Sequence, residues 1–389
     1  MKHESSDGVT GQRSGRRPCL PGWNPASGRV SGSAHGKTRP EAAFHLIHQT
    51  HRQGRLWLRQ AAAACGLLFF ALLVALPSAR AAAAAPLPAT CYLFAYFYHD
   101  REAEGFRLAW SPDGYRFEML NGGKSCLKPT AGEAKIMRDP CLYHGPDGLW
   151  HLVWTTGWTG RTIGYASSKD LIHWSEQQAI PVMMHEPQAQ NCWAPEIIWD
   201  DSRKHYLIFW STTILGQFPE TAMSNKGPER NHRVYATTTT DFKTYTPTKL
   251  LYDGGFNVID ATLLRDDDGS WLMFVKNETL SPKTEKNVRM IRGATAEGPW
   301  GEASPAFTGN YWAEGPTTIK VGGEYRVYFD KHRLDAIGLV RSRDLKTWED
   351  VSDQVKFPAH ARHGCIVAVP REVIEQLRAA WPETSETKP

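Results

Sequence analysis

The chain has 389 residues, of which 41% are hydrophobic and 11% aromatic, and its formal net charge is +4. Residues 1–81 hold 11 of the 45 Lys and Arg but only 3 of the 41 Asp and Glu, so the remainder is mildly acidic. A mildly acidic body lacks the basic surface that nucleic-acid binding requires, and we expect no nucleic-acid partner. The apolar content is sufficient for one large domain.

The first 59 residues are predicted to be a disordered basic extension. They are rich in Gly, Ser, Arg and Pro and show no regular spacing of apolar residues. Such a composition does not build a packed core. So long a stretch before a targeting signal is unusual, and an alternative is that translation starts nearer residue 55.

Residues 60–81 are predicted to be a signal peptide. Arg52, Arg55 and Arg59 precede an apolar run at 61–76, and "ARA" at 79–81 offers small residues for cleavage after Ala81. This order of charge, apolar run and small residues is typical of secretory signals. We therefore expect a periplasmic or extracellular protein with no stable membrane insertion after cleavage. An uncleaved signal anchor is the alternative.

From residue 86 to residue 389 the chain consists of pairs of short strand-like runs joined by turns. Runs such as "LWHLVWTT" and "SWLMFVK" are aromatic and β-branched, and the turn signals "GPDG" and "DDDG" precede them. Strong helical periodicity appears only at 370–381. The pattern predicts an all-β domain over 86–389 that ends in a short helix at 370–381.

Each second strand of a pair ends in the same short pattern. A small residue and an Asp are followed, four positions after the Asp, by an aromatic residue. An Asp at this place can accept hydrogen bonds from local backbone amides, and the aromatic ring can pack between neighbouring repeats. We interpret the pattern as a structural turn between outer strands. The copies are "SPDGYRF", "SSKDLIHW", "TTDFKTY" and "SRDLKTW", with a weaker relative in "ATAEGPW".

Each repeat also opens with a signature of its own, and the signatures are "RDPCLY", "WAPEII", "IDATLL", "AEGPTT" and "RHGCIV". Units of this length with about four strands predict a five-bladed β-propeller. The first hairpin, from Tyr92, has no opening strand, and the last opening, at His363, has no hairpin. We therefore predict that residues 363–369 pair with residues 91–98 and close the ring, which removes a free sheet edge.

The openings would bring three carboxylates, Asp139, Asp260 and Glu314, to one end of the central channel. Glycoside hydrolysis needs one protonated carboxyl group for the leaving oxygen and one carboxylate to activate water. A further negative charge beside the acid raises the pKa of that acid. For a single Asp before Pro, such as Asp139, a role in a turn is the simpler interpretation. The functional interpretation depends on all three groups occurring at comparable openings.

The ordered motifs Asp-Pro, Trp-Ala-Pro, Ile-Asp, Glu-Gly-Pro and His-Gly resemble those of glycoside hydrolase family 43, from about Tyr92 to Pro370. The resemblance implies a five-bladed propeller that hydrolyses arabinofuranosyl, xylosyl or galactosyl linkages of plant-type polysaccharides with inversion. Inversion requires the acid and base carboxyl groups to lie roughly 6.5–9.5 Å apart. Where family members usually have Asp-Pro-Ser, this chain has Asp-Ala-Thr at 260–262, which leaves the sugar open.

The resemblance also implies roles for individual residues. Asp139 corresponds to the general base, Glu314 to the general acid, and Asp260 to the residue that tunes the acid and orients the substrate. His363 would lie near the channel centre, where members hold a calcium ion or a water cluster. His363 is therefore a candidate metal ligand, through water. We expect the protein to require no cofactor for its activity.

Other residues are candidates for binding the sugar. Any of three tryptophans could stack on a sugar face, although packing in the core explains each equally well. Glu196 is a rival for the tuning role. Arg289 either binds a hydroxyl group or pairs with a surface acid. The full set of candidate binding residues is Trp158, Trp193, Glu196, Arg289, Trp312 and His363.

Five cysteines remain after signal cleavage, and their spacing matches no zinc-binding pattern. An odd number excludes a fully paired intramolecular set. Buried free thiols are the first interpretation, and one or two disulfides are the alternative. The cysteines are Cys91, Cys126, Cys141, Cys192 and Cys365.

We expect the protein to be a monomer.

Three other classes of function are less consistent with the sequence. A non-catalytic carbohydrate-binding propeller does not need both an acid and a base. A protein-interaction propeller of the WD type would show Gly-His and Trp-Asp signatures, which are missing. A sialidase would need an arginine cluster and a nucleophilic Tyr. The sequence thus predicts an exported glycoside hydrolase, with the sugar-binding propeller as the alternative. The sugar, the linkage and the exo or endo mode depend on loops such as 213–232.

Overall fold

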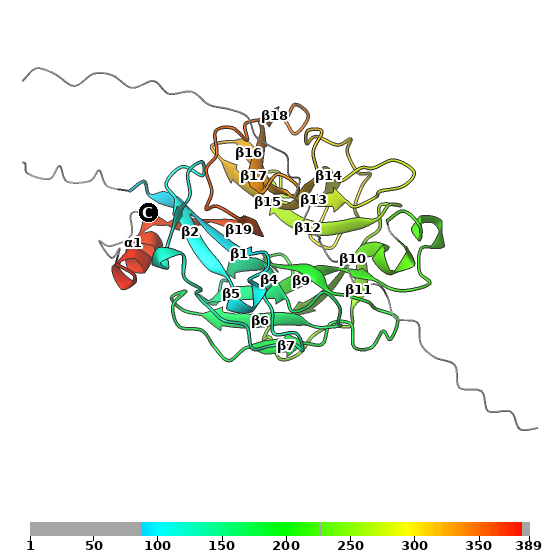
Figure 1. The fold of residues 1–389 in the computed structure, drawn as a ribbon, viewed down its shortest axis with the longest axis horizontal. Coiled ribbons are helices and arrows are strands. Elements are labelled where there is room, and N and C mark those ends of the chain that lie inside the picture. Colours follow the sequence, from blue (N-terminus) through cyan, green and yellow to red (C-terminus); the bar gives the residue numbers. More distant parts are fainter. Residues whose placement is uncertain (1–86, 226, 383–389) are drawn as a thin grey trace, which may run out of the picture. The chain divides into compact units, whose positions relative to one another are not determined.

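The computed structural model describes residues 87–225 and 227–382. Within these ranges the chain forms five antiparallel sheets and one α-helix (Figure 1). The predicted extension and signal peptide lie outside the described residues. No helix in the described ranges is both long enough and apolar enough to cross a membrane.

Five blades surround a common centre, because the innermost strands of successive sheets contact one another in a closed circle. The blades are named here by their place in the chain, and the strands of each are given from the inside outward. The closing blade contains β19 (Ala361–Pro370), β1 (Thr90–Tyr98), β2 (Arg107–Ser111) and β3 (Glu118–Met119). The second blade contains β4 (Arg138–His144), β5 (Trp150–Thr155), β6 (Ile163–Ser168) and β7 (Gln178–Ile180). The third contains β8 (Trp193–Asp200), β9 (His205–Thr213), β10 (His232–Thr239) and β11 (Lys249–Tyr252). The fourth contains β12 (Val258–Arg265), β13 (Trp271–Asn277) and β14 (Asn287–Gly293). The fifth contains β15 (Ala313–Val321), β16 (Glu324–Lys331), β17 (Ala336–Ser342) and β18 (Glu349–Asp350).

The predicted five-bladed propeller and its closure are confirmed. The last strand, β19, pairs antiparallel with β1 from Thr90↔Pro370 to Tyr98↔Ala361. Cys365 lies opposite Ala95 and Cys91 opposite Val369, so the two thiols are out of register, and all five cysteines in the described ranges are free. The fourth blade departs from the expected four strands. Its outer edge is a single bridge between Gly293 and Trp300.

The C-terminal helix α1 (Arg371–Ala380) begins directly after β19 and lies beside the closing blade (Figure 1). Its apolar side chains Ile374 and Leu377 are buried in the largest core cluster, together with Cys91 and Val369. The helix therefore covers the side of the closing blade, near the sequence-based bounds of 370–381.

The repeated Asp turns have the predicted structural role. In the second blade, Asp170 Oδ1 accepts hydrogen bonds from the backbone N–H groups of Ile172 and His173, at 2.9 and 2.8 Å. In the closing, third and fifth blades, the equivalent Asp residue accepts hydrogen bonds from the backbone amides two and three residues after it. The aromatic residue then packs against a neighbouring blade, as Trp174 does against Phe106.

We expect Asp170→Ala to lower the free energy of unfolding by about 1–2 kcal/mol, because two backbone amides lose their acceptor. The exposed neighbour Lys169 provides a control, and Lys169→Ala should change stability by less than about 0.5 kcal/mol. Urea unfolding of both variants measures the difference. Equal stability of the two variants would contradict a structural role for the turn.

The same stabilisation should depend on pH. Burial would raise the pKa of Asp170, but hydrogen bonds from His173, Ile172 and Ser168 outweigh it and lower the pKa below its usual value. The contribution of Asp170 to the free energy of unfolding is therefore complete above the unfolded-state pKa of about 3.9. It is lost as the pH falls through the lower pKa of Asp170 in the folded state. The gap between Asp170→Ala and the wild type should narrow in that acidic range.

Candidate active site

Every inner strand contains one extra residue near its start. In each blade the pairing with the second strand shifts by one residue at this point, for example between Glu314 and Thr317 in β15. The same β-bulge occurs in β4, β8, β12 and β19. Bulges of this kind bend a strand and change the direction of its side chains, which is why they recur beside active sites.

The bulges place two adjacent residues of each blade at the channel end. The residue that starts the bulge belongs to a first ring, and the residue after it belongs to a second ring. The second-ring residues of β4, β8, β12 and β15 have positive φ angles, from 45° at Ala194 to 58° at Gly315. The first ring is Arg138, Trp193, Ile259, Glu314 and Arg362, and the second ring is Asp139, Ala194, Asp260, Gly315 and His363.

This alignment corrects one sequence-based expectation. Asp139 and Asp260 occupy equivalent positions, but Glu314 lies one residue earlier in its own blade, and Glu196 lies two residues beyond the second ring. The carboxylates thus come from different layers of the channel. Because a bulge interrupts the strict alternation of strand side chains, residues from both layers reach the same pocket.

All ring residues except Ala194 and Gly315 line a pocket of about 250 Å³. Asp139, Asp260 and Glu314 all contribute to its wall, together with His363 and the tryptophans Trp158, Trp193 and Trp312. The structure therefore brings together seven of the nine residues singled out from the sequence. The two others are Glu196, which is buried behind the pocket wall, and Arg289, whose guanidinium group binds Glu285 at 3.0 Å outside the pocket.

The Asp139 carboxylate accepts a hydrogen bond on one oxygen and lies near His363 on the other. Thr155 Oγ1, from the end of β5, donates to Asp139 Oδ2 at 2.8 Å. His363 Nδ1 lies 3.4 Å from Asp139 Oδ1. The His363 ring packs directly against Gly315, where a Cβ atom would come within 2.3 Å of the ring. Glycine at position 315 thus permits both the positive φ angle and the approach of His363.

Asp260 is buried, and its carboxylate Oδ2 accepts a hydrogen bond from the backbone N–H of Gly315 at 3.0 Å. Burial raises the pKa of Asp260 to about 6, against the opposing effect of the nearby His363 and Lys276. The negative charges of Glu314 and Asp139 raise the same pKa further. Asp260 is therefore coupled electrostatically to both other carboxylates.

Glu314 lies in a different electrostatic environment, because cationic side chains surround it. Lys276 Nζ is 2.6 Å from Oε2, His332 Nδ1 is 2.6 Å from Oε1, and Arg362 Nη2 is 3.5 Å from Oε1. Burial alone would raise the pKa of Glu314, but Lys276 and His332 outweigh burial and hold the pKa well below its usual value. These neighbours thus favour the ionised form of Glu314.

Sequence reasoning missed several pocket residues that come from the second strands. Lys276 lies opposite Ile259 and Asp330 lies opposite Glu314, each at the end of a strand that runs antiparallel to the inner strand. Burial raises the pKa of Asp330 to about 6, with a further contribution from Glu314, while Arg362 acts in the opposite direction. The signal was available in the sequence, because the last residues of each second strand must lie beside the opening motif.

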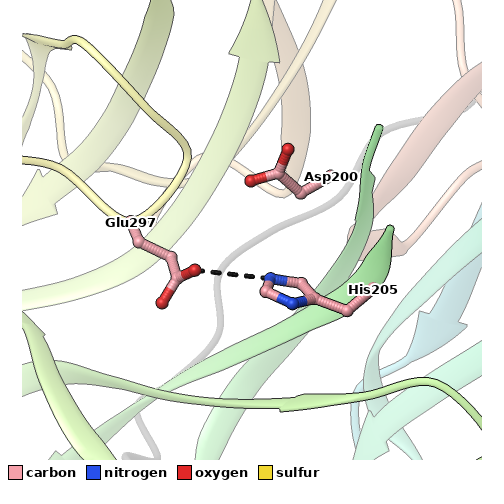
Figure 2. A group of neighbouring side chains, drawn as sticks. All are labelled: Asp200, His205 and Glu297. Atoms are coloured by element: carbon pink, nitrogen blue, oxygen red, sulfur yellow. Dashed lines mark ion pairs between the residues drawn. The ribbon is translucent and has the colours of Figure 1, made fainter. Parts of the chain in front are cut away.

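A further group of potential metal ligands lies between the third and fourth blades, outside the pocket. Figure 2 shows Asp200 at the end of β8, His205 at the start of β9, and Glu297 in the turn after β14. His205 Nε2 is 3.3 Å from Glu297 Oε1. Glu297 already binds Arg203 and Lys249, and these two positive charges oppose a cation. We therefore interpret the group as an ion-pair network between blades.

A propeller pocket with carboxylates from separate blades is the arrangement expected of a glycoside hydrolase, because hydrolysis needs an acid and a base on different sides of one bond. A family model described as "Probable glycosyl hydrolase domain", of the family-43-related type, matches residues 88–375. The chain belongs to this family.

Individual relatives are more distant. An α-L-arabinofuranosidase of Bifidobacterium longum subsp. longum is 26% identical over 273 residues, which cover 60% of this chain and 25% of that protein. This chain thus spans about a quarter of the length of that curated relative. Among solved structures, a thermostable family-43 glycoside hydrolase matches with a TM-score of 0.42 and 17% identity, over 55% of this chain and 71% of that one. An α-L-arabinofuranosidase from Lactobacillus brevis matches with a TM-score of 0.45 and 16% identity, over 56% and 72%. Likenesses at this level do not identify a sugar.

We expect Lys276→Met to raise the pKa of Glu314, because burial would then act with one fewer opposing positive charge. The pKa is measured by a pH titration of the carboxyl carbons with ¹³C NMR. Lys283→Met provides the control, since Lys283 is exposed and approaches Glu285 at 3.8 Å. A Glu314 pKa that stays the same in Lys276→Met would show that Lys276 does not set the charge of Glu314.

Proposed function

We propose that the protein hydrolyses arabinofuranosyl, xylosyl or galactosyl linkages with inversion, and that Asp139, Asp260 and Glu314 perform the reaction. The observation that carries this proposal is that the three carboxylates, from three blades, line one pocket. The Bifidobacterium longum relative is an α-L-arabinofuranosidase, which supports arabinofuranosides as the first substrates to test.

In the proposed mechanism Asp139 is the general base. Its carboxylate takes a proton from a water molecule as the oxygen of that water attacks the anomeric carbon. The hydrogen bond from Thr155 fixes the orientation of the carboxylate. Because the attack comes from the side opposite the leaving group, the product has the inverted configuration. Proton NMR of the sugar at early reaction times identifies the released anomer, and a retained configuration would overturn this step.

Glu314 is proposed to donate a proton to the leaving oxygen. Its cationic neighbours favour the ionised form in the free enzyme, so the protonated form needed for catalysis is maintained only at acidic pH. Asp260 acts in the opposite direction, since its negative charge raises the pKa of a nearby acid. We therefore infer an acidic pH optimum that the balance between Lys276 and Asp260 sets.

The protein is also proposed to act outside the cytoplasm, as a monomer, and without a required cofactor. The charged, apolar and small-residue order at 52–81 supports export. The donors around His363 fit a calcium ion poorly, because calcium takes six to eight oxygen ligands, whereas His363 faces one carboxylate, Asp139. No step of the mechanism is assigned to a metal.

Substrates with different leaving groups should separate the roles of the two main carboxylates. Glu314→Gln should lower the rate on natural glycosides by about two to four orders of magnitude, the usual contribution of general acid catalysis. Dinitrophenyl glycosides need little protonation and should be affected much less. Asp139→Asn should impair both kinds of substrate, because water must be activated whatever group leaves.

The measurement is the ratio of variant to wild-type kcat/KM on each substrate. Asp260→Asn should shift the basic limb of the pH–rate profile to lower pH, because a neighbouring negative charge is lost. Equal losses on both substrates for Glu314→Gln would mean that Glu314 is not the acid. Asp330 would then be tested first, because it lines the pocket and the pKa of its carboxyl group is raised to about 6.

Export makes a separate prediction. N-terminal sequencing of the protein recovered from the periplasm or the medium should give a mature chain that begins after Ala81. A full-length chain found only in the cytoplasm would contradict export but would leave the catalytic proposal unaffected.

A further inference from the structure

Each tryptophan of the pocket has an arginine over its ring. The guanidinium carbon of Arg138 is 4.1 Å from the ring centroid of Trp158, and that of Arg230 is 5.7 Å from Trp193. Arg333 lies 3.5 Å from the ring centroid of Trp312. Arg138 and Arg230 line the pocket and occupy faces that a neutral sugar ring would otherwise use for stacking, so the mouth is more polar than the tryptophans alone suggest.

Most positive charges of the pocket are neutralised by nearby carboxylates. Arg138 binds Glu102 at 2.6 Å, and Arg362 binds Asp330 at 2.7 Å. Lys276 lies between Glu314 and Glu278, at 2.6 Å from each. Lys286 also binds Glu278. These pairs leave little net charge in the deeper part of the pocket.

Arg230 is different. It lines the pocket, yet within residues 87–225 and 227–382 its guanidinium group forms neither an ion pair nor a hydrogen bond. Its partner Trp193 offers only the face of an aromatic ring. A half-buried guanidinium group carries five N–H donors, which are suited to bind an anion that comes with the substrate.

The backbone holds Arg230 in place. Arg230 ends a short 3₁₀ turn, Pro228–Arg230, and its carbonyl oxygen accepts a hydrogen bond from Asn257 Nδ2 at 2.6 Å. Asn257 is fully buried, and its Oδ1 accepts a hydrogen bond from the backbone N–H of His232 at 2.9 Å. A preorganised arginine loses less conformational freedom when it binds, which favours a specific contact.

We propose that the substrate carries a negatively charged group, a carboxylate or a sulfate ester, on or next to the sugar that is cleaved, and that Arg230 binds this group. Both groups present coplanar or closely spaced oxygens that match the guanidinium fork, whereas a neutral hydroxyl group gains little from a full positive charge. The proposal rests on the proposed hydrolysis at this pocket, and it narrows the substrate to acidic oligosaccharides.

The test uses matched pairs of oligosaccharides. One pair consists of a uronic-acid-bearing oligosaccharide and its carboxyl-reduced counterpart, and the other of a sulfated oligosaccharide and its desulfated counterpart. The two members of each pair have the same glycosidic linkage, which is an arabinofuranosyl, xylosyl or galactosyl linkage. The wild-type enzyme should prefer the acidic member of one pair by about 10- to 100-fold in kcat/KM, the usual effect of a charge-assisted hydrogen bond. The pair that shows the preference identifies the anion.

Arg230→Gln should abolish that preference, mainly through KM, because the contact is one of binding. Arg230→Lys should keep part of it, since the charge remains but the fork is lost. Arg333→Gln is the matched control, because Arg333 also lies over a tryptophan but does not line the pocket, and this variant should keep the preference. Equal kcat/KM on acidic and neutral members, or a preference that survives Arg230→Gln, would overturn the proposal.

A binding measurement separates this proposal from the catalytic one. In the Glu314→Gln background, titration calorimetry with the acidic oligosaccharide should show tighter binding than with its neutral counterpart, and Arg230→Gln should remove the difference. If the wild-type enzyme cleaves none of these linkages but the binding difference is present, the catalytic assignment fails and the anion site stands. If hydrolysis occurs without a binding difference, the anion site fails.

Discussion

The β-bulge at the start of each inner strand is the constraint on which the pocket depends. Without it, the side chains of an inner strand would alternate strictly, and only one residue of each opening motif would face the channel end. With it, two successive residues of three blades do so: Arg138 with Asp139, Ile259 with Asp260, and Arg362 with His363. The bulge therefore lets a narrow ring of five strands bring more polar groups together than regular strands could.

This arrangement costs backbone free energy at two of the proposed catalytic residues. Asp139 and Asp260 have φ angles of 50° and 55°, a region that non-glycine residues rarely occupy. Local hydrogen bonds offset the cost. Thr155 binds the side chain of Asp139, and Ser211 Oγ accepts a hydrogen bond from the backbone N–H of Asp260 at 3.1 Å. Thr155 comes from the second strand of the same blade as Asp139, whereas Ser211 comes from the second strand of the blade that precedes Asp260. The hairpin stabilises the strained conformation of Asp139, and a contact between blades stabilises that of Asp260.

The sequence was sufficient to predict the blades, the closure by β19 and the structural role of the Asp turns, because each of these follows from a local pattern that repeats. It did not reveal that Glu314 lies one residue out of line with Asp139 and Asp260. A bulge adds one residue without any distinctive composition, and only the pairing of two strands makes it visible. The cationic neighbours of Glu314 were missed for a related reason. Lys276 lies in β13, His332 in the turn after β16, and Arg362 in β19, so no single motif contains them. Arg289 was a candidate either for binding a hydroxyl group or for pairing with a surface acid, and its side chain pairs with Glu285 in the loop before β14.

The electrostatics of the pocket assign different proton affinities to carboxylates that are close together. Lys276 and His332 lower the pKa of Glu314, whereas burial raises the pKa of Asp260 and of Asp330 to about 6. These opposite shifts come from the different neighbours of each carboxyl group. Asp330 lies directly opposite Glu314 across the β15–β16 pair, and the negative charge of Glu314 adds to the effect of burial on the pKa of Asp330. A sugar that enters the pocket excludes water and strengthens every one of these charge interactions. The same argument explains why an anion on the substrate would have to bind at the mouth, at Arg230. Deeper in the pocket the cations are already paired, and a further negative charge there would lie beside Asp139 and Asp260.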